Sequence, residues 1–423
     1  MKKIFFRLNH LDTASRNAMF FTLEGAVGAI ILNMANPFFS MFARRMGASD
    51  YQIGLVSSLP ALIGILALIP GSILVDKSEN KKKVVSFLIL LFGIMYPLAA
   101  LTPLFGNYKV TVFITIIALM NWPFSVFNIS WQSFFSDVMV SKFNLAFTKR
   151  THVSTILGTT TALVAGLLLS YIPRNDSERI MMYQLFFFLS FILAIVQSWF
   201  LSRVTAPPIL KDNYNKPNKL ILIKECLNNL VLYKEFRIFT ILALIFHVAW
   251  HMGWPLFFIY EVDVIGVNEA WLSYVNVAVG FAGVITYSFW GKAIEKKGAK
   301  LILIAGTFGL AINALSMLLI HTRYMLLIQS TITGLTFSAF TLAIFENLIE
   351  VVPKKNKTIN IALYTTLINI SQFISPLVGV WLYKQTSIVF ALGFVGCLRL
   401  FATALFVIRY LKSKNKNKVK LQN

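Results

Sequence analysis

Long apolar runs alternate along the whole chain with short polar segments that carry most of the charge. The runs are repeatedly around 20 residues or longer, which is the length a helix needs to cross about 30 Å of hydrocarbon. Strands of a membrane barrel would instead give alternating segments of about ten residues. The pattern predicts twelve membrane-spanning helices, at 17–43, 51–75, 84–104, 109–136, 149–172, 180–202, 237–262, 270–290, 300–320, 323–346, 358–383 and 387–410.

One long polar interruption, at about 203–236, divides these runs into six and six. Within it, Leu220 to Tyr233 has apolar residues at helical spacing, which predicts an amphipathic helix on the cytoplasmic face. We therefore expect an all-α membrane protein with a first six-helix bundle over 1–203, a linker over 204–236, and a second six-helix bundle with a basic tail over 237–423.

Composition agrees with a membrane protein. The 423 residues are 57% hydrophobic and 13% charged, with a mean hydropathy of +0.71, whereas a soluble domain carries about 25% charged residues. The net charge of +22 would suggest a nucleic-acid partner in a soluble protein. Here the basic residues lie in loops between apolar runs, so the bilayer is the expected partner and nucleic acid is not.

The loops also predict an orientation. Alternate loops and the two ends carry 31 of the 39 Lys and Arg residues, and the opposite loops carry seven. Because basic loops stay on the cytoplasmic side, we expect both termini there, in a multi-pass protein of the cell membrane. The two cysteines, Cys226 and Cys397, suggest no disulfide framework,.

Two similar charged segments each join two apolar runs, about half a chain apart. The first reads Pro70-Gly71-Ser72-Ile73-Leu74-Val75-Asp76-Lys77-Ser78-Glu79-Asn80-Lys81-Lys82-Lys83, and the second reads Trp290-Gly291-Lys292-Ala293-Ile294-Glu295-Lys296-Lys297-Gly298-Ala299-Lys300. A glycine lets helices approach closely, and a carboxylate at a helix end can pair with a basic group or a neighbouring helix N-terminus. Such a bond can hold the cytoplasmic side of the helices closed in one state and break in another.

With six plus six spans, a long central loop and this repeated hinge, the chain resembles the major facilitator superfamily. The superfamily's hinge runs Gly-x-x-x-Asp-Arg-x-Gly-Arg-Lys. In the first copy the glycine is one place early and Glu79 replaces the second glycine; the second copy matches better. The segment 131–137, followed by Lys149-Arg150, is also similar to the superfamily's helix 4–5 region. The resemblance implies gating residues at Gly71, Asp76, Lys77, Arg150, Gly291, Glu295 and Gly298, with Lys81 to Lys83 serving mainly as orientation signals.

Polar side chains form stripes on several spans, and each buried amide brings groups that need partners. The resemblance implies that helices 1, 4, 7 and 10 line a central path. We therefore expect a water-accessible cavity for a small-molecule substrate, although Ser, Thr and Gly in such stripes could simply hold helices together. The amide candidates for substrate binding are Asn33, Asn36, Asn121, Asn128, Gln132, Asn369 and Gln372.

Helix 7 adds four aromatic or ionisable candidates: His247, Trp250, His251 and Trp254. The two histidines are four residues apart, so they share a face and could contact substrate, carry a proton, or serve as structural polar packing. A metal site would need further ligands at that depth, so none is expected. The tryptophans could belong to a lipid belt, but mid-depth placement favours the cavity.

Two further ionisable residues lie inside spans. Glu24 on helix 1 falls away from the stripe of Asn33 and Asn36, so pairing with a neighbouring helix and proton coupling are equal alternatives. Arg399 in the last span favours snorkelling or a helix–helix bond over substrate contact.

These patterns together predict a secondary active transporter that moves a small organic solute by alternating access. We expect proton coupling, by symport or antiport, with Glu24, His247 or His251 as the carrier. Efflux of lipophilic compounds, or a non-transporting receptor on the same scaffold, are the alternatives. No phosphate-binding Gly-Lys-Ser or Gly-Lys-Thr motif and no nucleophile–base pair occurs, so we expect no ATP-driven pump, no enzyme and no cofactor. The expected working form is a monomer.

Overall fold

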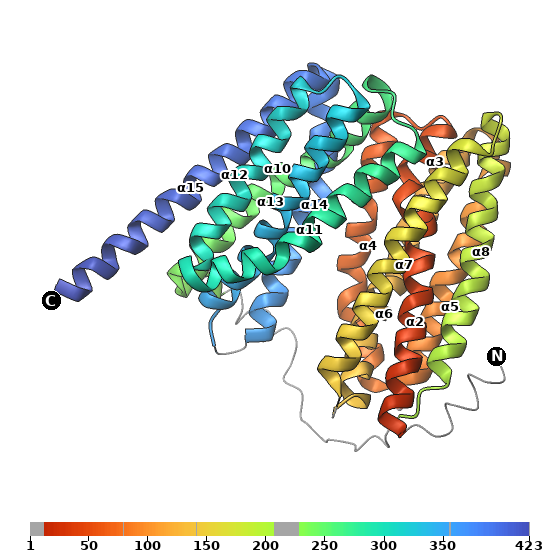
Figure 1. Ribbon diagram of the computed structural model, residues 1–423, viewed down its shortest axis with the longest axis horizontal. Coiled ribbons are helices and arrows are strands. Elements are labelled where there is room, and N and C mark those ends of the chain that lie inside the picture. Colours follow the sequence, from red (N-terminus) through yellow and green to blue (C-terminus); the bar gives the residue numbers. More distant parts are fainter. Residues whose placement is uncertain (1–11, 79, 141, 207–227, 355–356, 423) are drawn as a thin grey trace. The chain divides into compact units, whose positions relative to one another are not determined.

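The computed structural model describes residues 12–78, 80–140, 142–206, 228–354 and 357–422, except the side chains of 68–70, 72–77, 144, 358–359 and 416–422. The chain divides into two compact units, Met1–Asn213 and Tyr214–Asn423. Each unit is a bundle of helices lying side by side (Figure 1), and each is described here by itself.

The described part of the first unit holds six membrane-length helical spans, some of them in two pieces. Its elements are α2 (Thr13–Ala35), η1 (Asn36–Phe38), α3 (Phe39–Arg45), α4 (Asp50–Lys77), α5 (Lys81–Ala100), η2 (Thr102–Tyr108), α6 (Lys109–Val138), α7 (Phe143–Tyr171) and α8 (Asp176–Ser202).

Six such spans also lie in the described residues of the second unit. Its elements are α10 (Lys234–Ile259), η3 (Tyr260–Val264), α11 (Glu269–Lys297), α12 (Ala299–Ser316), η4 (Met317–Leu319), α13 (Arg323–Val351), α14 (Lys357–Gln385) and α15 (Ile388–Gln422).

The two halves share one packing scheme, as their similar hinges predict. In the first unit, α2 packs on α7 and α8, α4 on α6, and α5 on α6 and α8. In the second, α10 packs on α14 and α15, α11 on α13, and α12 on α13 and α15. The first helix of each half therefore contacts the fifth and the sixth, which is the arrangement of a structural repeat.

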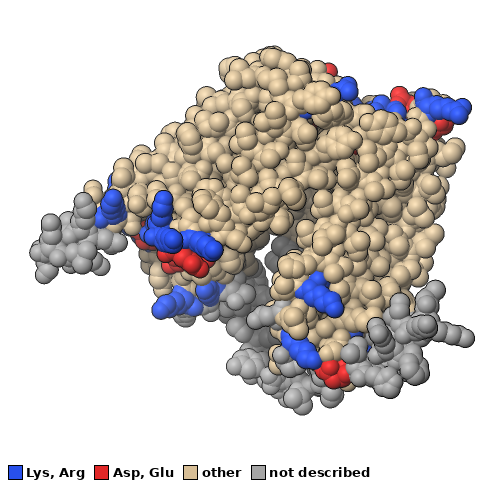
Figure 2. All heavy atoms as spheres, in the orientation of Figure 1, with Lys and Arg blue, Asp and Glu red and all other residues tan. Residues whose placement is uncertain are grey.

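Twelve helical spans in the described part of the chain are long and apolar enough to cross a membrane. Lys, Arg, Asp and Glu gather at the ends of the helices, and the walls between are almost free of charge on the face drawn in Figure 2. Such an uncharged band is what a hydrocarbon environment requires, because an unpaired charge there costs several kcal/mol, about 2.5–3.5 at the centre of a helix on insertion scales.

The first span differs from the sequence prediction in two ways. The first span begins at Thr13, capped by the Asp12 side chain, and not at 17. It is also interrupted: α2 ends at Ala35 and the 3₁₀ turn η1 follows, with Pro37 inside it. Proline has no N–H to donate to the carbonyl of the residue four places earlier, so it ends or kinks a helix. The predicted 17–43 run is therefore two helices joined at Asn36–Phe38.

The linker between the halves is described only in part. Residues 228–232 are helical, within the amphipathic helix predicted over Leu220 to Tyr233. The preceding part of that helix lies outside the described residues. Asn229 in the described part donates to the Asn360 side chain at 3.4 Å, so this end of the linker is attached to α14 of the second unit.

Candidate functional site

A carboxylate at the centre of the first unit has four hydrogen-bond donors around it. Glu24 on α2 is completely buried. Its Oε2 accepts from Arg150 Nε at 3.3 Å, Arg150 Nη2 at 3.2 Å and Trp131 Nε1 at 3.1 Å. Its Oε1 accepts from Gln197 Nε2 at 2.7 Å. Three helices, α6, α7 and α8, thus converge on one residue of α2.

This constellation needs a small residue beside the carboxylate. A Cβ added at Gly25 would lie 2.6 Å from Arg150 Nε, so only glycine lets the arginine lie across α2. The guanidinium carbon of Arg150 also lies 3.9 Å from the centre of the Trp131 ring, within the range of a cation–π interaction. The charge of Glu24 is therefore compensated by a cation that is itself held in place.

A cavity of about 380 Å³ opens beside this ion pair. That volume falls in the range of small-molecule sites, about 300–1,000 Å³. Asn33 and Asn128 line it, together with the phenyl rings of Phe124 and Phe127. The ion-pair arginine, Gln197 and the hydroxyl side chains of 151, 154 and 155 complete the polar wall.

Three polar groups on the cavity wall keep hydrogen-bonding capacity. Each amide nitrogen donates one bond to a carbonyl of its own helix, from Asn33 to Ala29 at 2.8 Å and from Asn128 to Phe124 at 3.0 Å. The buried hydroxyl of Ser154 has no hydrogen-bond partner among the described residues. The Ser154 hydroxyl is enclosed by its neighbours, so the two amides are the groups of this wall that are suited to bind a ligand.

A second chamber of about 170 Å³ lies in the same unit. It is lined by Asn36 and Asn121, with Phe124 forming part of both cavities. A small apolar void of about 20 Å³ lies against the same ring. The amides expected to share one cavity are thus divided between two: Asn33 and Asn128 line the larger, and Asn36 and Asn121 the smaller.

The histidines of α10 bind protein groups of the second unit. His247 Nδ1 lies 2.8 Å from the Ala243 carbonyl, one turn earlier in the same helix. His251 is buried, and its Nδ1 lies 3.0 Å from the Ser371 hydroxyl on α14. These contacts match structural polar packing, one of the roles that the sequence allows. Among the described residues, no group of three His, Cys, Asp or Glu side chains could hold a metal ion.

A buried arginine ties α15 to two neighbouring helices. Arg399 is 0% exposed, and it donates from Nη1 to the Leu310 carbonyl at 2.9 Å and from Nη2 to the Trp250 carbonyl at 3.4 Å. Its guanidinium carbon also lies 4.7 Å from the centre of the Trp250 ring. The sequence allowed snorkelling or a helix–helix bond for Arg399, and in the structure Arg399 forms the helix–helix bond. Trp250 packs against this cation and the ring of Phe337.

Of the other predicted ligands, Trp254 contacts the histidine pair. Gln132 is exposed on α6, and Trp254 on α10 is 36% exposed with its ring against His251. Asn369 and Gln372 are half-buried on α14. Their role in binding a solute stays a prediction.

The predicted hinge residues lie in different surroundings, some packed against a neighbouring helix and some exposed. Gly71 is buried where a Cβ would collide with the Val126 side chain on α6. Gly298 has φ +82° between α11 and α12, a conformation that favours glycine,. Gly291 has no atom within 4 Å of an added Cβ, and Glu295 is exposed. The side chains of Asp76 and Lys77, and all of Glu79, lie outside the described part of the chain.

The neighbouring lysines make specific contacts at this end of the first unit. Lys81 Nζ lies 2.6 Å from Asp137 Oδ2 and 2.9 Å from the Ser133 hydroxyl. Lys82 donates to the carbonyls of Ser202 and Val204 at 3.1 Å each, at the end of α8. These side chains thus connect three helix ends, a role that their reading as orientation signals did not predict.

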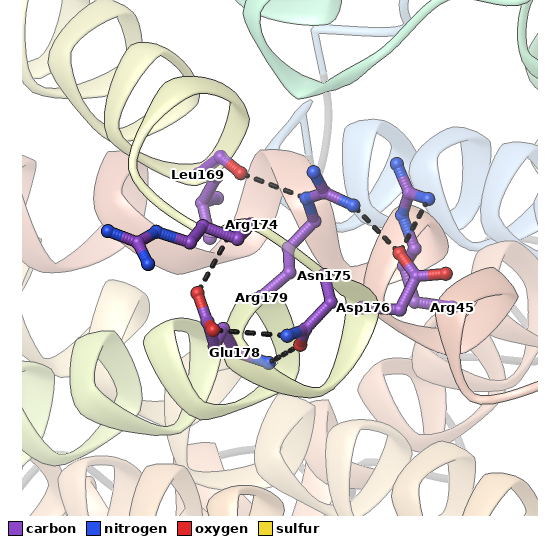
Figure 3. A network of polar contacts seen from close by, with 7 residues as sticks. All are labelled: Arg45, Leu169, Arg174, Asn175, Asp176, Glu178 and Arg179. Atoms are coloured by element: carbon purple, nitrogen blue, oxygen red, sulfur yellow. Dashed lines mark hydrogen bonds and ion pairs between the residues drawn. The ribbon is translucent and has the colours of Figure 1, made fainter.

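The opposite end of the first unit carries its own polar network (Figure 3). Asp176 at the start of α8 accepts from Arg179 at 2.7 Å and from Arg45 of α3 at 3.1 Å. Arg179 also donates to the Leu169 carbonyl of α7 at 3.0 Å. Glu178 closes the turn before α8 by accepting from the Asn175 amide at 3.0 Å. This network fixes the α7–α8 turn against α3.

Sequence reasoning missed four residues of the first-unit site. Trp131 and Gln197 donate to Glu24, Tyr96 donates to Asn36 at 2.8 Å, and Ser154 lines the larger cavity. Gln197 is a lone amide inside an apolar span, which is a signal that could have identified it. Ser154 and Trp131 carry no such signal, because a serine or a tryptophan is ordinary in a membrane helix.

Comparison with known proteins agrees with this architecture. The sequence profile of the Major Facilitator Superfamily matches residues 25–286 and 254–423. No curated protein matches the chain in sequence. Among solved structures, a variant of the nucleoside transporter NupG is similar at 12% identity, covering 93% of this chain and 99% of that one with a TM-score of 0.74.

Two further solved structures are similar at the same level. One is a bacterial homologue of the human lysosomal transporter Spinster, inward-facing and occupied, at 12% identity, 94% and 96% coverage and a TM-score of 0.69. The other is a variant of the peptide transporter POT in complex with sulfate, at 12% identity, 93% and 94% coverage and a TM-score of 0.67. At these identities the likeness concerns the fold.

Proposed function

The chain belongs to the major facilitator superfamily, and on that premise we propose that it is a secondary active transporter that moves a small, uncharged organic solute across the cell membrane by alternating access. The observation that carries the proposal is the cavity of about 380 Å³ in the first unit, whose wall combines amide groups, hydroxyls and two phenyl rings.

The balance of charges on the cavity wall favours an uncharged solute. Arg150, the one cation among the described residues of its wall, is paired with the buried Glu24, so these residues offer no net charge to an ion. A charged solute would leave its hydration shell without gaining a counter-ion, which is strongly unfavourable in a desolvated site. A neutral molecule with hydrogen-bonding edges and an apolar face matches the amides and the rings at once.

Glu24 is the proposed proton carrier. All four of its contacts come from donors, an arrangement suited to the ionised carboxylate, which only accepts. Protonation would remove the charge that holds Arg150 and would add a hydrogen where a donor now lies. Arg150 would then be released beside the cavity, so the proton state and the solute site would be coupled, and by linkage the coupling is reciprocal.

The histidines are weaker candidates for this role. His247 already contacts a carbonyl of its own helix, and His251 contacts Ser371. The guanidinium of Arg399 donates to the carbonyl of Trp250, which lies between the two histidines in sequence. The positive charge of Arg399 would therefore repel a proton on either histidine. Asn369, Gln372, Trp250 and the hinge residues stay proposals for solute contact and gating.

We further propose that both termini lie in the cytoplasm. The ends of the first unit support this orientation: the basic cluster of Lys81 and Lys82 joins helix ends on the same side as the start of α2, where Lys142 pairs with Asp12 at 3.1 Å. Basic residues concentrate on the cytoplasmic side of membrane proteins.

Flux through purified protein tests the proposal. The protein is reconstituted in liposomes, and uptake and efflux of a panel of labelled uncharged, cationic and anionic solutes are measured with and without a pH gradient. We expect accumulation of an uncharged solute that requires the gradient, and its direction distinguishes import from export. Movement of only charged solutes would reject the uncharged class, and no flux of any solute would reject the transporter.

A further inference from the structure

The interruption of α2 coincides with the smaller chamber of the first unit. Asn36 is the first residue of the 3₁₀ turn that follows α2, and Pro37 comes next. The same Asn36 lines the chamber of about 170 Å³. Discontinuous helices in transporters free backbone and side-chain groups near the middle of the membrane, and binding sites form there. This chamber lies about 16 Å along the helix axis from Gly25, at the helical rise of about 1.5 Å per residue.

The two amides of this chamber keep complementary groups unused. Asn36 Oδ1 accepts from the buried Tyr96 hydroxyl at 2.8 Å, and Asn121 Nδ2 donates to the Pro60 carbonyl. Among the described residues, the amide nitrogen of Asn36 and the amide oxygen of Asn121 have no hydrogen-bond partner, and both residues line the chamber. One chamber therefore holds an unused donor and an unused acceptor.

Two stacked rings separate this chamber from the larger cavity. Phe92 of α5 and Phe124 of α6 lie with ring centres 5.1 Å apart and planes inclined by 29°. Phe124 lines the larger cavity, the smaller chamber and the 20 Å³ void, while Phe92 lines the last two. The void has an apolar lining apart from Gln197, and a water molecule needs 2–4 polar partners. The partition between the two compartments is thus hydrophobic.

We propose that the chamber at Asn36 and Asn121 is a second solute compartment, that it binds a planar, uncharged lactam or carboxamide, and that Phe124 is the specificity-determining residue between the two compartments. This inference deepens the proposed function and rests on it. A lactam carries an N–H and a C=O side by side, so it can accept from Asn36 and donate to Asn121 at once.

The remaining lining supports the same class. Phe39, Phe92 and Phe124 supply aromatic faces on which a flat ring can stack,. None of the described residues that line the chamber is charged, so an ion would lose hydration without compensation. The volume of 170 Å³ is below the range of drug-sized pockets, about 300–1,000 Å³,, which suits a small ring.

Equilibrium binding of two matched probes tests the class. Labelled uracil carries the lactam edge, and 1,3-dimethyluracil keeps the planar ring but has no N–H to donate. With the full-length protein in lipid nanodiscs, we expect uracil to bind and the dimethyl compound to bind at least about tenfold more weakly, equivalent to about 1.4 kcal/mol. Equal binding of the two probes, or no binding of uracil, would overturn the lactam assignment.

Variants locate the compartment. Asn36→Ala and Asn121→Ala should each weaken uracil binding about tenfold, while Asn276→Ala, which removes an exposed amide of α11, should leave it unchanged. Phe124→Ala should admit 5-benzyluracil, which the wild-type chamber is too small to hold. Unchanged uracil affinity in both asparagine variants would overturn the second compartment.

The failure of this inference differs from the failure of the proposed function. If the liposome panel shows gradient-driven flux of another neutral solute while uracil does not bind, the transporter stands and the compartment assignment falls. Asn121 also holds Pro60, so its variant could misfold. Asn36→Ser is therefore measured beside it, with the thermal unfolding midpoint of every variant as the folding control.

Discussion

Glu24 and Arg150 form a buried ion pair across 126 residues of sequence, with Arg150 Nη2 3.2 Å from Glu24 Oε2. The glutamate is 0% exposed and the arginine side chain 20% exposed, on the wall of the larger cavity. One partner is thus sealed from water while the other borders the proposed solute site. A pair with this asymmetry can report the proton state of the carboxylate to the cavity.

The first prediction concerns the stability of this pair. Arg150→Met leaves a buried carboxylate without its cation, which typically costs about 3–5 kcal/mol. Glu24→Gln with Arg150→Met removes both charges, so we expect the double variant to unfold at a higher temperature than Arg150→Met alone. Thermal unfolding of the four proteins in one detergent gives the coupling energy, and strictly additive midpoints would show that the two residues do not interact.

The second prediction compares two glycines of the second unit. A Cβ at Gly334 of α13 would collide with the Val279 carbonyl oxygen and lie 2.9 Å from the Ala282 Cβ, whereas a Cβ at Gly280 of α11 meets nothing within 4 Å. Gly334→Ala should therefore separate α11 from α13 and lower the unfolding temperature, by about 1–3 kcal/mol in stability. Gly280→Ala should be neutral or stabilise by up to about 1 kcal/mol. Equal midpoints for the two variants would contradict this close helix contact.

The third prediction concerns Arg399. Its planar guanidinium reaches carbonyls on two helices at once, at Leu310 and Trp250. A lysine ammonium keeps the charge but lacks the fork that spans both. We expect Arg399→Lys to lose one of these bonds and to lower stability by about 1–3 kcal/mol, measured as the unfolding midpoint. Arg409→Lys, near the end of the same helix, serves as a comparison, and an unchanged Arg399→Lys midpoint would argue against the two-helix bond.

The fourth prediction concerns orientation. Single cysteines are introduced at Ser78, next to Lys81–Lys83, and at Lys414 in the basic tail, after Cys226 and Cys397 have been replaced. We expect each to react with a membrane-impermeant maleimide only after the membrane is opened. A cysteine at Asp176, in the network of Figure 3, should react in intact cells. The reverse labelling pattern would place the termini outside.

The fold was predictable because its signals are local. The apolar runs, the basic loops and the repeated hinge each lie within about 20–30 consecutive residues, so they indicated twelve helices in two halves. Pro37 was visible in the first run, but one proline does not show whether a membrane helix bends or breaks. The structure has a break at Asn36–Phe38, and the predicted amides line two compartments.

The site was less predictable because its contacts are not local. Gln197 reaches Glu24 from 173 residues away, and only the packing of α8 on α2 brings the two together. The sequence could place Glu24 on the face opposite Asn33, yet it could not decide between pairing and coupling, since both use a buried carboxylate. Arg150 was identified through the family motif as a gating residue, and its partner became evident only in the folded bundle.

The central claim is that Glu24 couples proton movement to solute movement. The most direct test compares solute exchange with gradient-driven solute accumulation in liposomes. Glu24→Gln keeps the size of the side chain but cannot exchange a proton, while Glu178→Gln at the end of the unit is the matched control. For a solute that the wild type transports, we predict that the exchange rate of Glu24→Gln stays within about threefold of the wild-type rate. Gradient-driven accumulation should fall by at least about tenfold, because the substitution removes the coupling free energy and keeps solute binding. Undiminished, pH-dependent accumulation by Glu24→Gln would contradict the account.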